Sequence, residues 1–333
     1  MSRITRDVTS PSPARYGAAA SVLITALWLG PGIAASAEPS TRTEYPLWAF
    51  PTPLPRPATP SSEKNLSVPG SAIRFSEAQL GDRSTAMDWF PSSHAPMPAV
   101  VAGNRTGADA CGYCHLPTGE GRPENAPIAG LPYSYLVDQL HEMQSGQRGA
   151  LPHFGASELM LRAVQQLSDA DIEAAAGYYA AIPYAKHLRV VEAGTVPHFT
   201  VNGTYRFDGE GPPEPLGERI LEGPDDWIDF WNRDSHSTYT AYVPVGAIAR
   251  GATLAQGDGP RRLACSACHD SALRGFIGPP LAGRSPTVTF RQLYAFQQDL
   301  RMDRDAPVMK AVLGGLSISE LIDLSAYSAS LLP

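Results

Sequence analysis

The sequence lacks most of the features that would assign it an enzymatic or membrane-spanning role. It contains no HExxH motif, nucleophile elbow, P-loop or dinucleotide-binding fingerprint. Beyond the N-terminus it has no apolar run of the roughly 20 residues that a membrane span requires. It has no excess of positive charge either, since the formal net charge is −7 over 333 residues. An acidic surface repels phosphate backbones, which argues against nucleic acid as a partner.

Cysteine is also scarce, with four residues in the whole chain. In an exported protein four cysteines would ordinarily suggest two disulfides. Their spacing indicates something else, because they form two pairs separated by two residues, each followed at once by a histidine. The two motifs are Cys111-Gly-Tyr-Cys114-His115 and Cys265-Ser-Ala-Cys268-His269.

The N-terminus is typical of an export signal. Arg3, Arg6 and Arg15 precede an apolar run over 18–29, and the small residues at 35–37 suit signal peptidase. We therefore expect a signal peptide over 1–37 and a periplasmic mature protein. The alternative is an uncleaved N-terminal anchor that would attach the protein to a membrane.

Proline and glycine, in contrast, are abundant, with 32 and 30 residues. Residues 38–99 are dense in proline near their start and lack helical or strand periodicity, which predicts an irregular extension that packs against the first domain. Residues 193–244 are rich in glycine, proline and acids. We expect turns there, with a short hairpin around 201–204.

The strongest organisational signal is an internal repeat. Besides the two cysteine motifs, Gln139-Leu140 recurs as Gln292-Leu293 and Leu167-Ser168 recurs as Leu316-Ser317, with offsets of 149 to 154. Matches in the same order at nearly one offset indicate two copies of one folding unit. We place these domains at 100–192 and 245–333, joined by the inter-domain segment 193–244.

Each copy is predicted to be helical. Ser168 with Asp171, and Ser317 with Glu320, suit capping boxes for a final helix in each copy. Residues 133–146 and 288–302 also show helical periodicity. The helix before the first cysteine motif is predicted to be weak, whereas 251–268 is a better candidate in the second copy.

The spacing CxxCH is typical of covalent haem c attachment. Both thiols can add to the porphyrin vinyl groups from one turn of chain, and the next residue can then ligate the iron. A zinc site made of the four cysteines would leave His115 and His269 without a role. A thioredoxin-like thiol pair needs a βαβ setting, which the sequence does not show. We therefore expect two haem c groups.

The sixth iron ligand separates electron carriers from enzymes. Met160 lies seven residues before Leu167, and Met309 lies seven residues before Leu316, so a methionine occupies the same place in both copies. Thioether ligation suits reversible electron transfer because it raises the reduction potential and fills the sixth position. His153 and Met302 are the competitors for the first and second haem.

A carbonyl acceptor for each proximal histidine is expected in the segments 279–283 and 126–130. A proline carbonyl of Pro279 or Pro280 is the expected partner of His269, and Pro127 is a weaker candidate for His115. Such a bond would fix the tautomer of the imidazole.

With these motifs the chain resembles the diheme class I cytochromes c of the bacterial periplasm, whose members carry two similar domains in tandem. The resemblance covers roughly 100–183 and 245–333, from the CxxCH motifs through Met160 and Met309 to the final helices. It implies an all-α fold in which each domain wraps one haem with His/Met ligation. It also implies electron transfer between periplasmic or membrane complexes, respiratory chains among them. Two departures are a long segment 193–243 and a first ligand loop that is five residues longer.

Three functions fit these expectations. The first is a carrier, not an enzyme, that relays single electrons to a redox partner such as a terminal oxidase, a reductase or a dehydrogenase. The second is a fixed electron-accepting subunit of a dehydrogenase complex. The third is a diheme enzyme, such as a peroxidase or a thiosulfate-oxidising cytochrome, which would need an exchangeable iron site.

Overall fold

Two sets of helices, one per copy of the repeat, form the main body of the protein in the computed structural model. The structure describes residues 45–51, 65–103, 105, 107–149, 155–257 and 262–333. The expected signal peptide and most of the proline-dense stretch lie outside these residues. Residues 44–333 form one compact unit. Within the described ranges, no helix has the length and apolar character of a membrane span.

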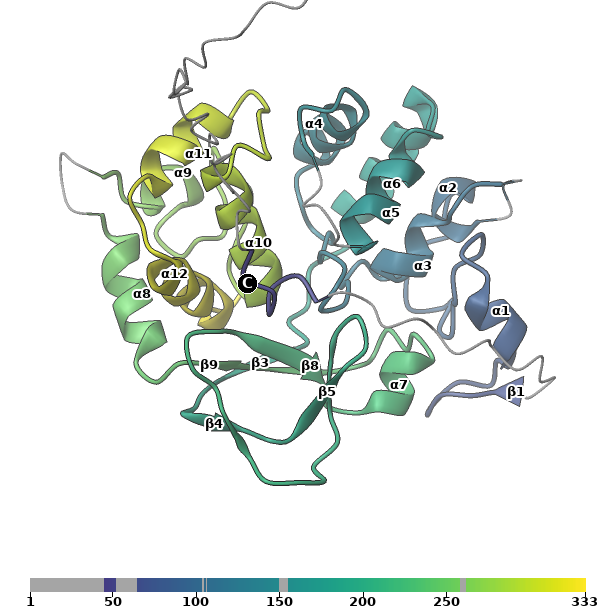
Figure 1. The fold of residues 1–333 in the computed structure, drawn as a ribbon. Helices are drawn as coiled ribbons and strands as arrows, with labels where there is room; N and C mark the ends of the chain where they lie inside the picture. Colours follow the sequence, from purple (N-terminus) through teal and green to yellow (C-terminus); the bar gives the residue numbers. More distant parts are fainter. Residues whose placement is uncertain (1–44, 52–64, 104, 106, 150–154, 258–261) are drawn as a thin grey trace, which may run out of the picture. The chain divides into compact units, whose positions relative to one another are not determined.

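The first copy contains a short helix before its cysteine motif, the motif itself, and three longer helices that Figure 1 shows in teal. They are α2 (Ala99–Ala102), α3 (Cys111–His115), α4 (Tyr133–Gln144), α5 (Gly155–Val164) and α6 (Asp169–Ala180). Helix α2 is only four residues long, which confirms the weakness predicted there. The hydrophobic core of the first copy joins Val100 and Val101 of α2 to Leu136 of α4 and to Tyr178 and Tyr179 of α6.

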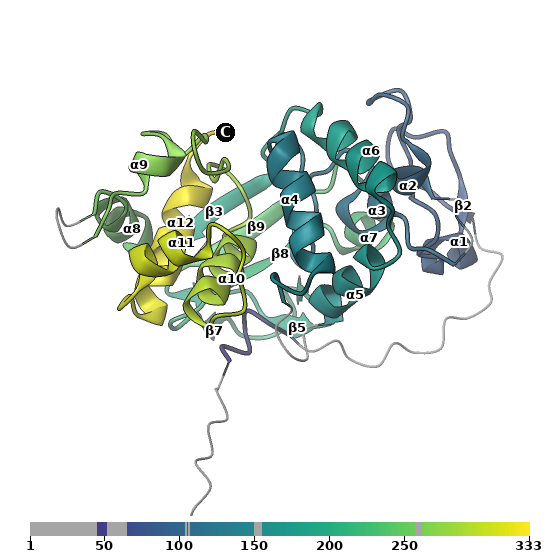
Figure 2. The same cartoon turned by 90° about the horizontal axis from the view of Figure 1, so that it is seen from above.

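The second copy repeats this order with a longer opening helix. Its elements are α8 (Ala247–Ala255), α9 (Ser266–His269), α10 (Pro286–Gln297), α11 (Ala306–Leu313) and α12 (Ile318–Ser330). Figure 2 shows α8 beside α12. The core of this copy includes Phe290 and Leu293 of α10 and Leu321 and Ile322 of α12, all buried.

Both final helices begin at the predicted capping boxes. The hydroxyls of Ser168 and Ser317 accept from the backbone N–H groups of Asp171 and Glu320, and those two carboxylates accept from the backbone N–H groups of the serines. Aspartate therefore completes the box in the first copy as glutamate does in the second. Each box satisfies two N–H groups that a helix start would otherwise leave unpaired.

The expectation of an all-α chain is too narrow, because the inter-domain segment forms strands. Strands β3 (Leu188–Glu192) and β9 (Tyr239–Val243) pair in parallel, and β8 (Leu221–Pro224) pairs antiparallel with β9. Both β3 and β9 contain valine, tyrosine or threonine residues, which favour extended backbone on a buried sheet. Their apolar side chains pack on Phe230 and on Ala329 of α12.

Shorter strands complete this segment. The hairpin predicted around 201–204 is confirmed, since β5 (Phe199–Val201) pairs antiparallel with β6 (Tyr205–Phe207). Strands β4 (Thr195–Val196) and β7 (Glu214–Pro215) form a second antiparallel pair, and α7 (Trp227–Trp231) follows β8.

Residues 65–98 pack against the first copy, as expected of the extension. They hold β1 (Asn65–Leu66), β2 (Phe75–Ser76) and α1 (Glu77–Gly81). The Tyr113 hydroxyl donates to the Leu80 carbonyl at 3.0 Å, and Trp89 is buried with its indole N–H on the Asn232 carbonyl at 2.8 Å. The extension thus reaches both the first cysteine motif and the inter-domain segment.

Repeated residues also bind the two copies to each other. Arg148 donates to the amide oxygens of Gln139 and Gln292 at 2.7 and 2.9 Å, and Arg301 donates to the same two oxygens at 2.6 and 3.2 Å. The two arginines are 153 positions apart, as are the two glutamines. The backbones of the arginines also form an antiparallel bridge. The repeat therefore builds a contact to which each copy gives the same two residues.

Gly251 allows the close crossing of α8 and α12. A Cβ at this position would lie 2.0 Å from the Asp323 carbonyl oxygen and 2.7 Å from Cβ of Tyr327. The Asp323 carboxylate beside it accepts two bonds of 2.8 Å from the Arg250 guanidinium.

We expect Gly251→Ala to lower the free energy of unfolding by about 1–3 kcal/mol, because the added methyl group forces these helices apart. Denaturant titration followed by far-UV circular dichroism measures this loss. The matched control is Gly177→Ala in α6, where an added Cβ meets nothing within 4 Å. There the substitution should stabilise by up to about 1 kcal/mol. Equal effects of the two variants would contradict the proposed crossing constraint.

Two CxxCH sites

Each cysteine motif lies on a single helical turn that ends in the same way. The residue after the histidine has a left-handed backbone in both copies, with φ of 65° at Leu116 and 66° at Asp270. The chain therefore turns away directly after His115 and His269. This common geometry leaves both thiols and the imidazole of each motif on one short, fixed piece of backbone.

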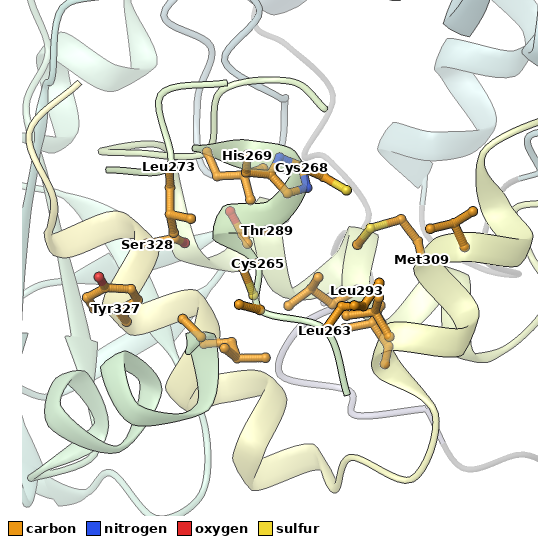
Figure 3. Close-up of a pocket in the computed structure, with 17 residues that line it drawn as sticks. Leu263, Cys265, Cys268, His269, Leu273, Thr289, Leu293, Met309, Tyr327 and Ser328 are labelled. Atoms are coloured by element: carbon orange, nitrogen blue, oxygen red, sulfur yellow. The ribbon is translucent and has the colours of Figure 1, made fainter. Parts of the chain in front are cut away.

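The second motif opens onto an apolar cavity. Besides Cys265, Cys268 and His269, the cavity is lined mostly by aliphatic side chains, among them Leu273, Leu281, Leu293, Val308, Val312, Leu313 and Leu324. The space outside protein atoms is about 640 Å³ when the open mouth is included. Figure 3 shows the Met309 side chain extending from α11 toward the side on which Cys268 and His269 lie.

Each motif histidine is oriented by a backbone carbonyl. His269 Nδ1 donates to the Pro279 carbonyl oxygen at 2.8 Å, so a proline carbonyl of the predicted segment is the acceptor. In the first copy His115 Nδ1 donates to Ala126, also at 2.8 Å, and not to Pro127. The two acceptors are equivalent positions in the repeat, one residue before the proline shared by both copies, so the prediction for Pro127 was wrong by one residue. These bonds leave Nε2 of each ring as the atom free to ligate.

Burial lowers the pKa of both His115 and His269, although the bond to the carbonyl opposes this shift in each case. The imidazoles are therefore held neutral, which is the form that binds a metal ion. Gly278 lies against the ring of His269, where a Cβ would approach Cε1 to 2.5 Å. Close packing thus adds to the hydrogen bond in fixing this imidazole.

The four thiols are unpaired, and burial works against the activation of three of them as nucleophiles. None of the four forms a disulfide. Burial raises the pKa of Cys111 to about 12 and also raises the pKa values of Cys114 and Cys265. A redox-active CxxC pair requires a lowered pKa, so the shift is opposite to that of a thioredoxin-like site. Among the described residues no three cysteine, histidine or acidic side chains gather as a metal-ion site.

The residues present fit a haem c group at the second motif. The cavity is apolar, both thiols lie on its lining, and a neutral histidine stands beside them with Nε2 unprotonated. The first motif has the same helical turn, the same turn after the histidine and the equivalent carbonyl acceptor.

Comparison with known proteins agrees with this chemistry. No family model matches the chain. Cytochrome c4 of Pseudomonas aeruginosa is 25% identical to it over 234 residues, which cover 68% of this chain and 86% of that protein.

The chain resembles the diheme class I cytochromes c.

Solved structures show partial likeness to this chain. A thiosulfate dehydrogenase from Marichromatium purpuratum is 27% identical, with a TM-score of 0.47 over 68% of this chain, which spans 37% of that one. Cytochrome c4 from Pseudomonas stutzeri is 22% identical, with a TM-score of 0.44 over 67% and 93% of the two chains. Cytochrome c4 from Acidithiobacillus ferrooxidans is 22% identical, with a TM-score of 0.42 over 66% and 98%.

This likeness supports two covalently bound haem c groups and a role in electron transfer. The motif cysteines of the chain are the residues that would form the thioether links. Thioether links and apolar walls would hold the haem in the folded copy. Its binding would therefore stabilise the folded state of each copy.

The predicted sixth ligands have different surroundings. Met309 lines the same cavity as His269, whereas Met302, its competitor, has 64% of its surface exposed. Met160 lies on α5 and is partly buried. His153, the competitor in the first copy, lies outside the described residues. The structure thus gathers cysteines, histidine and methionine around one cavity in the second copy.

Two arginines near the first motif are not evident from the sequence pattern. Arg233 comes from the inter-domain segment and Arg122 follows the motif by seven residues, and both are buried. Arg233 has no counterpart in the repeat, so its contact with the motif follows only from the folded segment 193–244. The contact that it makes with Tyr113 could not be predicted from spacing.

Proposed function

We propose that this diheme cytochrome is an exported electron carrier that passes single electrons between redox proteins of the periplasm or membrane. The observation that carries the proposal is the cavity of the second copy, where Met309 and His269 line one space. A protein ligand on each side would leave the iron no open position for a substrate, which suits a carrier and not an enzyme. We assign one haem to 100–192 and one to 245–333.

The residues of each copy have separate tasks in this proposal. Cys111 and Cys114, and Cys265 and Cys268, would anchor the haems. His115 and His269 would be the proximal ligands, with Met160 and Met309 as the sixth ligands. When bound, each haem iron takes up and releases one electron, and the apolar walls keep water away so that little reorganisation accompanies the change.

Net charge supports a protein partner with a basic docking surface. The formal charge of −7 would speed encounter with such a partner, and the association rate should fall as salt screens it. We propose a terminal oxidase, a reductase or a dehydrogenase as that partner, and cleavage of residues 1–37 on export. The chemistry would be the same if the protein were a permanent electron-accepting subunit of a dehydrogenase complex.

The visible spectrum of the oxidised holoprotein tests the ligation. Methionine-ligated ferric haem has a weak band at about 695 nm, and we expect an intensity that corresponds to two haems. Met309→Ala and Met160→Ala should each remove about half of it. Met302→Ala should leave it unchanged, because that side chain is exposed and does not line the cavity.

Absence of the band, or one high-spin haem that binds cyanide or peroxide readily in the unmodified protein, would contradict the carrier proposal. In the second case the protein would have the exchangeable iron site that a diheme peroxidase or a thiosulfate-oxidising enzyme needs.

A further inference from the structure

The inter-domain segment places a buried arginine directly on the first haem-attachment motif. Arg233 is 8% exposed and donates from Nη1 to the Tyr113 carbonyl oxygen at 2.8 Å. Its guanidinium carbon lies 3.6 Å from the centre of the Tyr113 ring. Tyr113 stands between the two motif cysteines and directly before Cys114. Arg233 itself has a left-handed backbone, with φ of 58°, so the loop after α7 holds it in a conformation that few residues adopt.

A second buried arginine reaches the same place from the first copy. Arg122 is 8% exposed, donates from Nη2 to the Phe230 carbonyl oxygen at 3.1 Å, and lies with its guanidinium carbon 3.9 Å from the Phe230 ring centre. Neither Arg122 Nε nor Arg233 Nε has a hydrogen-bond partner among the described residues. Apart from the Glu124 carboxylate on Arg122, the groups that hold the two guanidinium groups are aromatic rings and carbonyls, which supply no countercharge.

Acidic groups near this pair compensate only part of its charge. Glu124 lies 3.2 Å from Arg122. Asp109 is paired with Arg83, and Asp234 accepts from the backbone N–H of His236. Burial lowers the pKa of Arg233 to about 10, and repulsion from Arg122 adds to the shift. A pKa of about 10 still leaves the group charged at neutral pH.

The first arginine contacts the first motif directly, because Arg233 binds the carbonyl and the ring of the residue before Cys114. The second motif has different surroundings. The repeat equivalent of Arg122 is Phe276, which is 78% exposed. Arg262 lies near Cys265 but is only partly buried, so water screens its charge.

We infer that Arg233, assisted by Arg122, sets the reduction potential of the first haem above that of the second. Reduction of a haem iron adds one negative charge, so a buried and poorly compensated cation beside the haem favours the reduced state. The inter-domain segment would thus give the two haems different reduction potentials. This inference requires only that one haem is attached at each motif. It does not depend on the proposed function as an electron carrier.

Spectroelectrochemical titration of the full holoprotein tests this role. Arg233→Gln should lower the potential of one haem by an amount that changes its Fe(II)/Fe(III) ratio about tenfold, which is about 59 mV for one electron. Arg233→Lys, which keeps the charge, should retain most of the original potential. Arg206→Gln is the matched control, because Arg206 belongs to the same segment but stacks on Trp227. It should leave both potentials unchanged.

Haem content and circular dichroism of each variant show whether it is folded and fully loaded. If Arg233→Gln is loaded and shifts neither potential, or if the lysine and glutamine variants shift it equally, charge does not set the potential and the inference is wrong. A shift of both haems by the same amount would also overturn it. None of these outcomes concerns the band at about 695 nm that reports methionine ligation. The inference about Arg233 can therefore fail while the proposed carrier function stands.

Discussion

Replacing Cys265 and Cys268 together by serine should reduce the covalently bound haem from two groups per chain to one. The second copy should lose stability at the same time, by more than about 3 kcal/mol, because its aliphatic cavity would be left without the group that fills it. The ratio of haem to protein after acid extraction, together with denaturant titration, measures both effects.

The matched variant is the double substitution Cys111→Ser with Cys114→Ser, which should also leave one haem, now on the second copy. Retention of two covalently bound haems by either variant would contradict the assignment of one group to each motif. If only one of the two variants loses a haem, the motifs are not equivalent in attachment.

Arg284→Leu should destabilise the protein as strongly as any single substitution outside the cysteine motifs. Arg284 is 7% exposed and donates three bonds of 2.9 Å, to the carbonyls of Pro280, Pro127 and Ala129. Its guanidinium also lies over the Tyr184 ring, 4.4 Å from the centre. Loss of these bonds leaves buried carbonyls unsatisfied, which costs about 3–5 kcal/mol in all.

This arginine joins the two segments that carry the histidine acceptors, since Pro127 and Pro280 directly follow Ala126 and Pro279. We therefore expect Arg284→Leu to disturb the spectra of both haems as well as the unfolding midpoint. Arg274→Leu, at an exposed position close in sequence, should change the free energy of unfolding by less than about 0.5 kcal/mol. If Arg284→Leu lowers the free energy of unfolding no more than Arg274→Leu does, the three hydrogen bonds of Arg284 contribute little to stability.

The repeated parts of the chain were predictable because their signals are local. A capping box, a helical period and the CxxCH spacing each depend on residues a few positions apart, so Ser168, Ser317 and both cysteine motifs could be assigned from the sequence. The hairpin at 201–204 could be predicted from an Asn-Gly turn in the same way. The repeat also doubled the evidence for each feature.

Other parts could not be predicted because they depend on contacts far apart in the chain. Strand β3 finds its parallel partner β9 some fifty residues later, across a segment whose composition suggested turns and one short hairpin but no parallel pair. Arg233 meets Tyr113 over 120 positions, and Arg284 meets Pro127 over 157. The prediction of Pro127 misses Ala126 by one residue because the backbone position, and not the presence of a proline, determines which carbonyl faces the histidine.

The contact of Arg148 and Gln139 with Arg301 and Gln292 has a consequence for how the two halves would behave apart. A patch that meets its own repeat is self-complementary, which is the property of a twofold-symmetric dimer interface. Expressed as separate chains, each half would be able to pair with itself as well as with the other half. The connecting peptide suppresses such mispairing by holding the correct partner at an effective concentration on the order of millimolar. Tethering, more than any difference between the two patches, therefore selects the unlike pair.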